Sequence, residues 1–203
     1  PAKDLIFYQA DIHGNELTKE RLKCLRRMAE GKPFTVVTTF SSLMSQQIPL
    51  SVWKENVISI NGQTTVDESE LSRKLVKLGY EKTYQVEAPG QFSIRGGIVD
   101  IFDLTEENPY RIELWGDEVE SIRSFDILSQ RSIEKLSSIS IYPACEMTLS
   151  EEQLKKGMEK IEKEGKSFAQ KLREDFHTEE AHRVETQIKE LKEEVFEFKN
   201  LVN

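Results

Sequence analysis

Residues 92–102 read FSIRGGIVDIF, and residues 109–126 read PYRIELWGDEVESIRSFD. Apolar, β-branched and aromatic residues alternate with polar ones, the pattern of strands that bury one face. Two adjacent glycines, Gly96 and Gly97, interrupt the first stretch and predict a tight bend or a β-bulge. These two stretches therefore predict the centre of a small antiparallel sheet.

The sheet extends to both sides of this centre. Strand signals separated by turn residues occur at 83–87, 91–102, 110–115, 119–126 and 138–142. An amphipathic helix is predicted from Asp67 to Gly79, with an apolar stripe of Leu71, Leu75 and Leu78. Residues 54–148 are predicted to form a small antiparallel β-sheet domain with one covering helix.

Residues 1–53 are typical of part of an α/β domain. A helix is predicted at 15–31, a strand buried on both faces at 34–40 (FTVVTTF), and a short helix from Ser41 to Pro49. The GxxxxGK[ST] loop that cradles nucleotide phosphates does not occur in the sequence. We therefore expect this chain neither to bind nor to hydrolyse ATP.

Residues 149–203 have helical periodicity throughout. Apolar residues recur at spacings of three and four in two runs, one after Ser150 and one after Thr178. The pattern predicts a helical hairpin, for which a coiled-coil role and packing onto another part of the protein remain equally open.

Composition excludes several classes of function. The formal net charge of −8 opposes the broad basic surface that phosphate-backbone binding needs. No apolar run approaches the length of a membrane span, so no membrane association is expected and the predicted location is cytoplasmic. Neither a nucleophile motif nor a cluster of metal ligands stands out, and we predict no catalytic residue, cofactor or metal.

Alternation along 110–115 separates two kinds of side chain. Arg111, Glu113 and Trp115 share one face, and the residues between them face the core. A tryptophan pointing away from the core beside an arginine is typical of binding hot spots. The alternative is that Trp115 packs under a neighbouring loop while Arg111 pairs with nearby acids. We also expect Arg95 and Arg111 to be exposed and to contribute little to folding.

At these residues the sequence resembles a known family. GQFSIRGGIVDIFDLTEENPYRIELWGDEVESIRSFDILSQRS (90–132) and ISIYPACE (139–146) are similar to the UvrB-homology module of bacterial transcription-repair coupling factors. The similarity is dense over 80–146. It is looser over the first sixty residues, where QADIHGNELTKERL and FTVVTTFSSLM carry it. Over 149–203 only the helical character is similar.

The resemblance implies a layout and a set of partners. Residues 1–53 correspond to the first lobe of a degenerate helicase-like α/β domain, 54–148 to an inserted UvrA-binding domain, and 149–203 to the helical start of the returning lobe. The family recruits UvrA to stalled RNA polymerase for nucleotide excision repair. In the full-length protein, RNA polymerase and DNA are bound by other domains, which form an ATP-dependent translocase. The C-terminal domain masks the UvrA-binding surface.

The resemblance also assigns site residues. The family's UvrA-contacting arginines match Arg95 and Arg111, and its contacting aromatic residue, usually Phe, matches Trp115. UvrB itself is the nearest alternative, although no tyrosine-rich hairpin precedes the insert. A further alternative is a sheet that binds single-stranded nucleic acid through Arg95, Arg111, Arg123 and Trp115.

Overall fold

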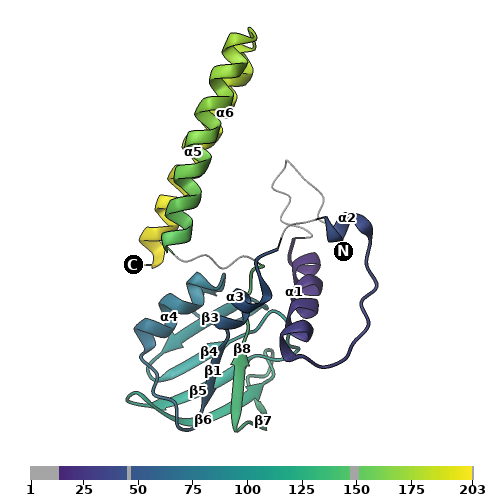
Figure 1. The fold of residues 1–203 in the computed structure, drawn as a ribbon. Coiled ribbons are helices and arrows are strands. Elements are labelled where there is room, and N and C mark those ends of the chain that lie inside the picture. The colour runs from purple at the N-terminus through teal and green to yellow at the C-terminus, as the bar shows by residue number, and fades with distance from the viewer. Residues whose placement is uncertain (1–13, 45–46, 147–150, 203) are drawn as a thin grey trace. The chain divides into compact units, whose positions relative to one another are not determined.

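The computed structural model describes residues 14–44, 47–146 and 151–202 (Figure 1). The chain divides into two compact units, Pro1–Thr148 and Leu149–Asn203, which are described separately. The mixture of helices with antiparallel sheets and a C-terminal helical pair confirms the predicted α+β class. No described helix is long and apolar enough to cross a membrane.

A six-stranded sheet forms the body of the first unit, with the strand order β2-β3-β4-β5-β6-β7. Its strands are β2 (Glu81–Lys82), β3 (Gln91–Arg95), β4 (Ile98–Ile101), β5 (Tyr110–Trp115), β6 (Glu118–Phe125) and β7 (Ser132–Lys135). The neighbours from β3 to β7 are antiparallel, as predicted, whereas β2 runs parallel to β3. The strand predicted at 83–87 is wrong, because these residues belong to the connection that returns the chain from β2 to the start of β3.

The Gly96–Gly97 pair forms the two-residue turn of the β3–β4 hairpin, which confirms the predicted tight bend. Both glycines have positive φ angles, 56° and 81°. A two-residue hairpin turn favours this conformation at both positions, and glycine adopts it without a steric cost. A Cβ on Gly97 would also lie 3.0 Å from the carbonyl oxygen of Leu114 on the neighbouring strand.

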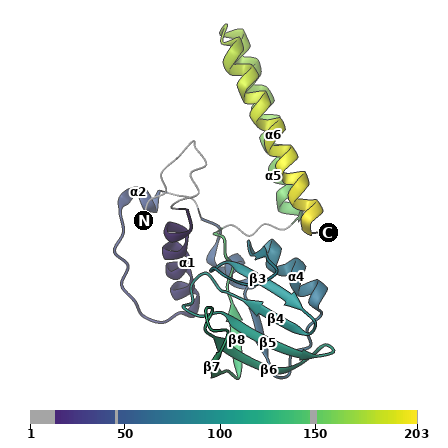
Figure 2. The ribbon, with the colours of Figure 1, turned by 180° about the vertical axis from the view of Figure 1, so that it is seen from behind.

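One face of the sheet is apolar and covered. The predicted helix is α4 (Glu68–Lys77), which begins where the Asp67 carboxylate accepts a hydrogen bond from the Glu70 backbone N–H. Beside it lies a two-stranded antiparallel sheet of β1 (Ile58–Asn61) and β8 (Ser138–Ile141) (Figures 1 and 2). Side chains from all these elements form one buried core, which includes Leu71, Leu75, Ile60, Ile141, Phe92, Val99 and Ile112.

Helices α1 (Gly14–Glu30), α2 (Phe40–Leu43) and α3 (Leu50–Glu55) precede this sheet domain. A small second core joins Leu22 of α1 and Trp53 of α3 to Leu104 and Tyr142 of the sheet domain. The buried strand predicted at 34–40 is wrong, since this segment is irregular up to Phe40 and Val37 is almost fully exposed. Apolar β-branched residues form a strand only where another strand pairs with them, and no described strand does so here. The short helix predicted after it is reduced to the four residues of α2, and residues 45–46 lie outside the described part.

The second unit is a hairpin of α5 (Glu151–Glu174) and α6 (Thr178–Val202), as predicted. Ala169 and Ala181 are fully buried, and a Cβ on Gly165 would clash with Ile188 Cδ1, so that the Ile188 side chain would have to move. Two ion pairs connect the helices, Arg173–Glu185 at 2.6 Å and Lys192–Glu162 at 3.0 Å.

Candidate protein-docking site

The uncovered face of the six-stranded sheet carries its polar side chains. Strand register places Asp100 opposite both Ser93 and Arg111, and Arg111 opposite Arg123. We call this surface the polar face: Ser93, Arg95, Asp100, Arg111, Glu113, Trp115, Arg123 and Lys135. The alternation predicted along β5 is confirmed, because Ile112 and Leu114 are buried in the core on the other side.

A buried carboxylate lies at the centre of the polar face. Asp100 is only 1% exposed. Its Oδ1 accepts a hydrogen bond from Arg111 Nε at 2.7 Å, and its Oδ2 accepts from Arg111 Nη2 at 2.8 Å and from Arg95 Nη2 at 3.2 Å. Burying a lone carboxylate is costly, and the hydrogen bonds from the two guanidinium groups offset that cost for Asp100.

Arg111 is held on several sides. Besides its two bonds to Asp100, it donates from Nη2 to Gln130 Oε1 at 2.8 Å, and its guanidinium lies 4.2 Å from the centre of the Phe125 ring. The hydrogen bonds and charge of Asp100 raise the pKa of Arg111. The expectation that Arg111 is exposed is wrong, since its side chain is 17% exposed and its strand neighbour is the buried acid.

Arg95 and Trp115 are more exposed to solvent than Arg111. The Arg95 side chain is 35% exposed, at the end of β3, and its guanidinium lies 5.5 Å from the centre of the Tyr84 ring. Trp115 is 80% exposed at the end of β5. The alternative that a loop covers Trp115 is therefore wrong among the described residues, whereas its other half, Arg111 paired with an acid, is observed.

Sequence reasoning missed Asp100 and Gln130. Asp100 stands between Val99 and Ile101, both buried apolar residues, so alternation alone would have placed it on the face of Arg111. No comparable signal marks Gln130, which lies in the loop between β6 and β7. We call Arg95, Asp100, Arg111 and Gln130 the face cluster.

The polar face also holds polar atoms that are left without partners. Arg123 pairs with Glu113 through Nη2, but its Nε is buried and has no hydrogen-bond partner among the described residues. The buried hydroxyl of Ser93 has none there either. Buried polar atoms are rarely left unpaired, so their presence on one face distinguishes it from the rest of the domain.

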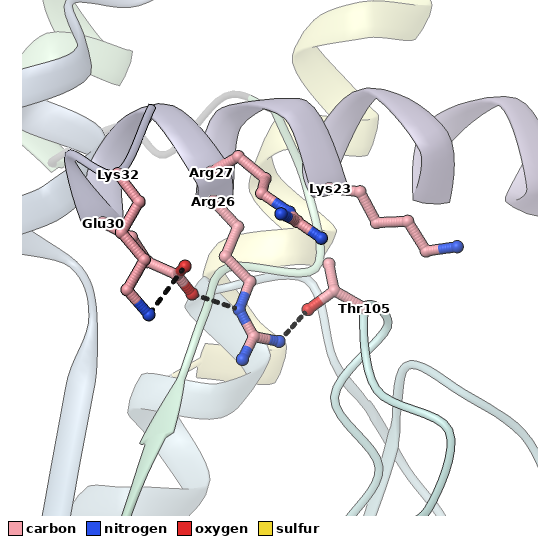
Figure 3. Close-up of a pocket in the computed structure, with 6 residues that line it drawn as sticks. All are labelled: Lys23, Arg26, Arg27, Glu30, Lys32 and Thr105. Carbon is pink, nitrogen blue, oxygen red and sulfur yellow. Dashed lines mark hydrogen bonds and ion pairs between the residues drawn. The ribbon is translucent and has the colours of Figure 1, made fainter. Parts of the chain in front are cut away.

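A second polar site lies beside the C-terminal half of α1 (Figure 3). Its lining residues are Lys23, Arg26, Arg27, Glu30, Lys32 and Thr105. Arg26 Nη1 lies 2.5 Å from Glu106 Oε1 and donates to Thr105 Oγ1 at 2.7 Å. Burial alone would lower the pKa of Arg26, but the hydrogen bond and charge of Glu106 outweigh it and raise the pKa. Because these contacts attach α1 to the loop after β4, this site serves to hold the first unit together.

The described residues do not place three or more histidine, cysteine or acidic side chains where they could hold a metal ion. The polar face offers hydrogen-bond donors, charge and an aromatic surface. These groups suit binding to another macromolecule.

Comparison with known proteins places this face within a recognised module. The model of the family described as "UvrB interaction domain" matches residues 58–147, which include the whole polar face. The transcription-repair-coupling factor of Bacillus subtilis (strain 168) is 40% identical over 182 residues, 90% of this chain and 16% of that protein. The chain belongs to the transcription-repair-coupling factor family.

Other members of the family agree. The transcription-repair-coupling factors of Staphylococcus aureus (strain MRSA252) and Staphylococcus haemolyticus (strain JCSC1435) are each 32% identical over 152 residues, 75% of this chain. The chain spans 13–16% of the length of these curated relatives. The family similarity thus concerns one segment of much longer proteins.

Proposed function

We propose that the polar face docks UvrA, and that this chain is the non-catalytic module through which a transcription-repair-coupling factor recruits UvrA to stalled RNA polymerase for nucleotide excision repair. One observation carries the proposal. Arg95 and Arg111 share the buried carboxylate of Asp100, and an exposed Trp115 lies on the same uncovered face of a UvrB interaction domain.

The chemistry of this face suits an acidic partner surface. Two guanidinium groups share one carboxylate, so the face cluster carries a surplus positive charge within a chain of net charge −8. Guanidinium N–H groups form strong, charge-assisted hydrogen bonds to carboxylates. Trp115 supplies the apolar centre that a hot spot needs, and the arginines fix the orientation of the partner.

The domain layout is part of the proposal. Residues 54–148 are the docking domain, inserted in a degenerate helicase-like α/β domain, to which 1–53 and 149–203 contribute. Trp53 stacks on Tyr142 with ring centres 5.6 Å apart, so α3 packs directly on the docking domain. RNA polymerase, DNA and ATP would engage other domains of the full-length protein, and its C-terminal domain would mask the polar face.

The test is the affinity of the purified chain for UvrA, measured by calorimetry or by surface immobilisation. We expect the wild-type chain to bind and a variant with Arg95→Ala, Arg111→Ala and Trp115→Ala to lose binding. A parallel titration with single-stranded DNA at rising salt tests the nucleic-acid alternative, for which binding should be weak. Equal UvrA affinity of the wild-type and triple-variant chains would refute the docking assignment.

A further inference from the structure

We propose that Gln130 is a positioning residue of the docking site, which holds the Arg111 guanidinium in the orientation that the partner binds. This inference rests on the proposed docking function. It extends the site from strands β3–β5 to the loop that connects β6 and β7.

The Gln130 side chain is fixed at both ends of its amide. Oε1 accepts a hydrogen bond from Arg111 Nη2, and Nε2 donates to the backbone oxygen of Ile127, each at 2.8 Å. The loop that contains Gln130 has hydrogen bonds of its own. The Asp126 carboxylate accepts from the backbone N–H and the hydroxyl of Ser129 at 2.8 and 2.6 Å. Gln130 is therefore a fixed acceptor rather than a mobile surface side chain.

The backbone of Gln130 adopts a conformation that glutamine disfavours. Its φ angle is +59°, and among the described residues only one other non-glycine residue, Phe176, has a positive φ. A glycine would complete the same turn without strain. Strained backbone persists where the surrounding structure requires it, often at binding sites. What glutamine adds here and glycine lacks is the amide in contact with Arg111.

The contact determines which donors Arg111 keeps for a partner. Nε and Nη2 are used by Asp100 and Gln130, and the Phe125 ring lies against the guanidinium. Among the described residues none accepts a hydrogen bond from Nη1, which leaves that nitrogen for a carboxylate of the partner. Without Gln130, Arg111 could rotate about its bonds to Asp100, and binding would have to fix it again.

Two substitutions test the role of the amide. Gln130→Gly removes it and relieves the backbone, and Gln130→Asn shortens the side chain by one methylene while tolerating a left-handed backbone. We expect each to lower UvrA affinity by about tenfold, the scale of one lost hydrogen bond to a charged group. Melting temperature should change little. Phe176→Gly is the matched control, since it relieves the same backbone conformation in the helical hairpin and should leave UvrA affinity unchanged.

A double-mutant cycle separates positioning from direct contact. If Gln130 acts through Arg111, Gln130→Gly lowers affinity in the wild-type background and has little further effect in the Arg111→Ala background. An equal loss in both backgrounds, or no loss in either, overturns the inference while leaving the docking proposal intact. If Arg111→Ala itself leaves affinity unchanged, the docking proposal fails, and this inference fails with it.

Discussion

Two clusters in the first unit pair arginine with a buried carboxylate, one between α1 and the chain after β8 and one on the polar face. In the first, which we call the anchor cluster, Arg21 bonds to both oxygens of Glu146 at 2.8 and 3.0 Å and to the hydroxyl of Ser42 at 3.1 Å. Gln47 also donates to Glu146 at 3.0 Å. The Arg21 and Glu146 side chains are 10% and 5% exposed.

The two clusters differ in how their arginines are bound and in their surroundings. In the anchor cluster both oxygens of Glu146 bind one guanidinium group, and all three nitrogens of that group have partners. In the face cluster two arginines meet one carboxylate, and an exposed Trp115 shares the same face. We therefore take the second guanidinium and the exposed aromatic ring, rather than the buried arginine–carboxylate pair itself, as the features that the proposed docking requires.

Arg111→Ala should have the largest effect, because it removes both a docking group and the main partner of Asp100. We expect the free energy of unfolding to fall by about 3 kcal/mol, since the buried Asp100 would lose both hydrogen bonds from Arg111 and keep the longer one from Arg95. UvrA affinity of the folded protein should fall by about thirtyfold or more. Denaturant titration and binding calorimetry measure the two effects. A normal UvrA affinity with lowered stability would mean that the face cluster, like the anchor cluster, only stabilises the fold.

Arg21→Ala should affect stability alone. The variant removes both hydrogen bonds that Arg21 donates to the buried carboxylate of Glu146, so a loss of about 3 kcal/mol in the free energy of unfolding is expected. UvrA affinity of the folded fraction should equal that of the wild-type chain. A fall in affinity as large as that of Arg111→Ala would remove the distinction between the two clusters.

Trp115→Ala should show the opposite behaviour. The ring is 80% exposed, so its loss should leave the melting temperature nearly unchanged. Removing a central hot-spot aromatic residue typically costs about 2 kcal/mol, or about thirtyfold in affinity. Trp115→Phe, which keeps an aromatic surface, should retain most of the binding. If Trp115→Ala unfolds the domain instead, the residue contributes to the core and the docking assignment fails.

The sequence predicts the elements that depend on local periodicity. Alternation along β5 places Arg111 and Trp115 on one face, the Gly96–Gly97 pair marks the hairpin turn, and apolar spacing identifies α4 and the helical hairpin. Strand alternation repeats every two residues and the helical pattern every three or four residues. Each of these features can therefore be recognised within one short segment of the chain.

Features that depend on distant pairing could not be predicted in the same way. The bond between Asp100 and Arg111 follows from the register of β4 against β5, and the strained conformation of Gln130 follows from the loop that closes onto them. Residues 34–40 have the composition of a buried strand, yet the structure gives them no partner strand among the described residues. The composition of a segment indicates that it can form a strand, but it does so only where the rest of the fold supplies a partner strand.

Arg131→Ala should have the smallest effect and sets the scale for the others. Arg131 follows Gln130 directly, but its side chain is exposed. Its backbone oxygen accepts a hydrogen bond from the Asp126 N–H at 2.9 Å. Alanine keeps that carbonyl, so the loop and Gln130 should stay in place, and the free energy of unfolding should change by less than about 0.5 kcal/mol.

The variant also removes one positive charge, as Arg111→Ala does. If general charge attraction drives docking, Arg131→Ala and Arg111→Ala should weaken UvrA binding to similar extents, with a similar dependence on salt. If a fixed guanidinium is required, Arg111→Ala should lower UvrA affinity by about thirtyfold or more, and Arg131→Ala should leave it nearly unchanged. Affinities of both variants measured across a salt series decide between these two accounts.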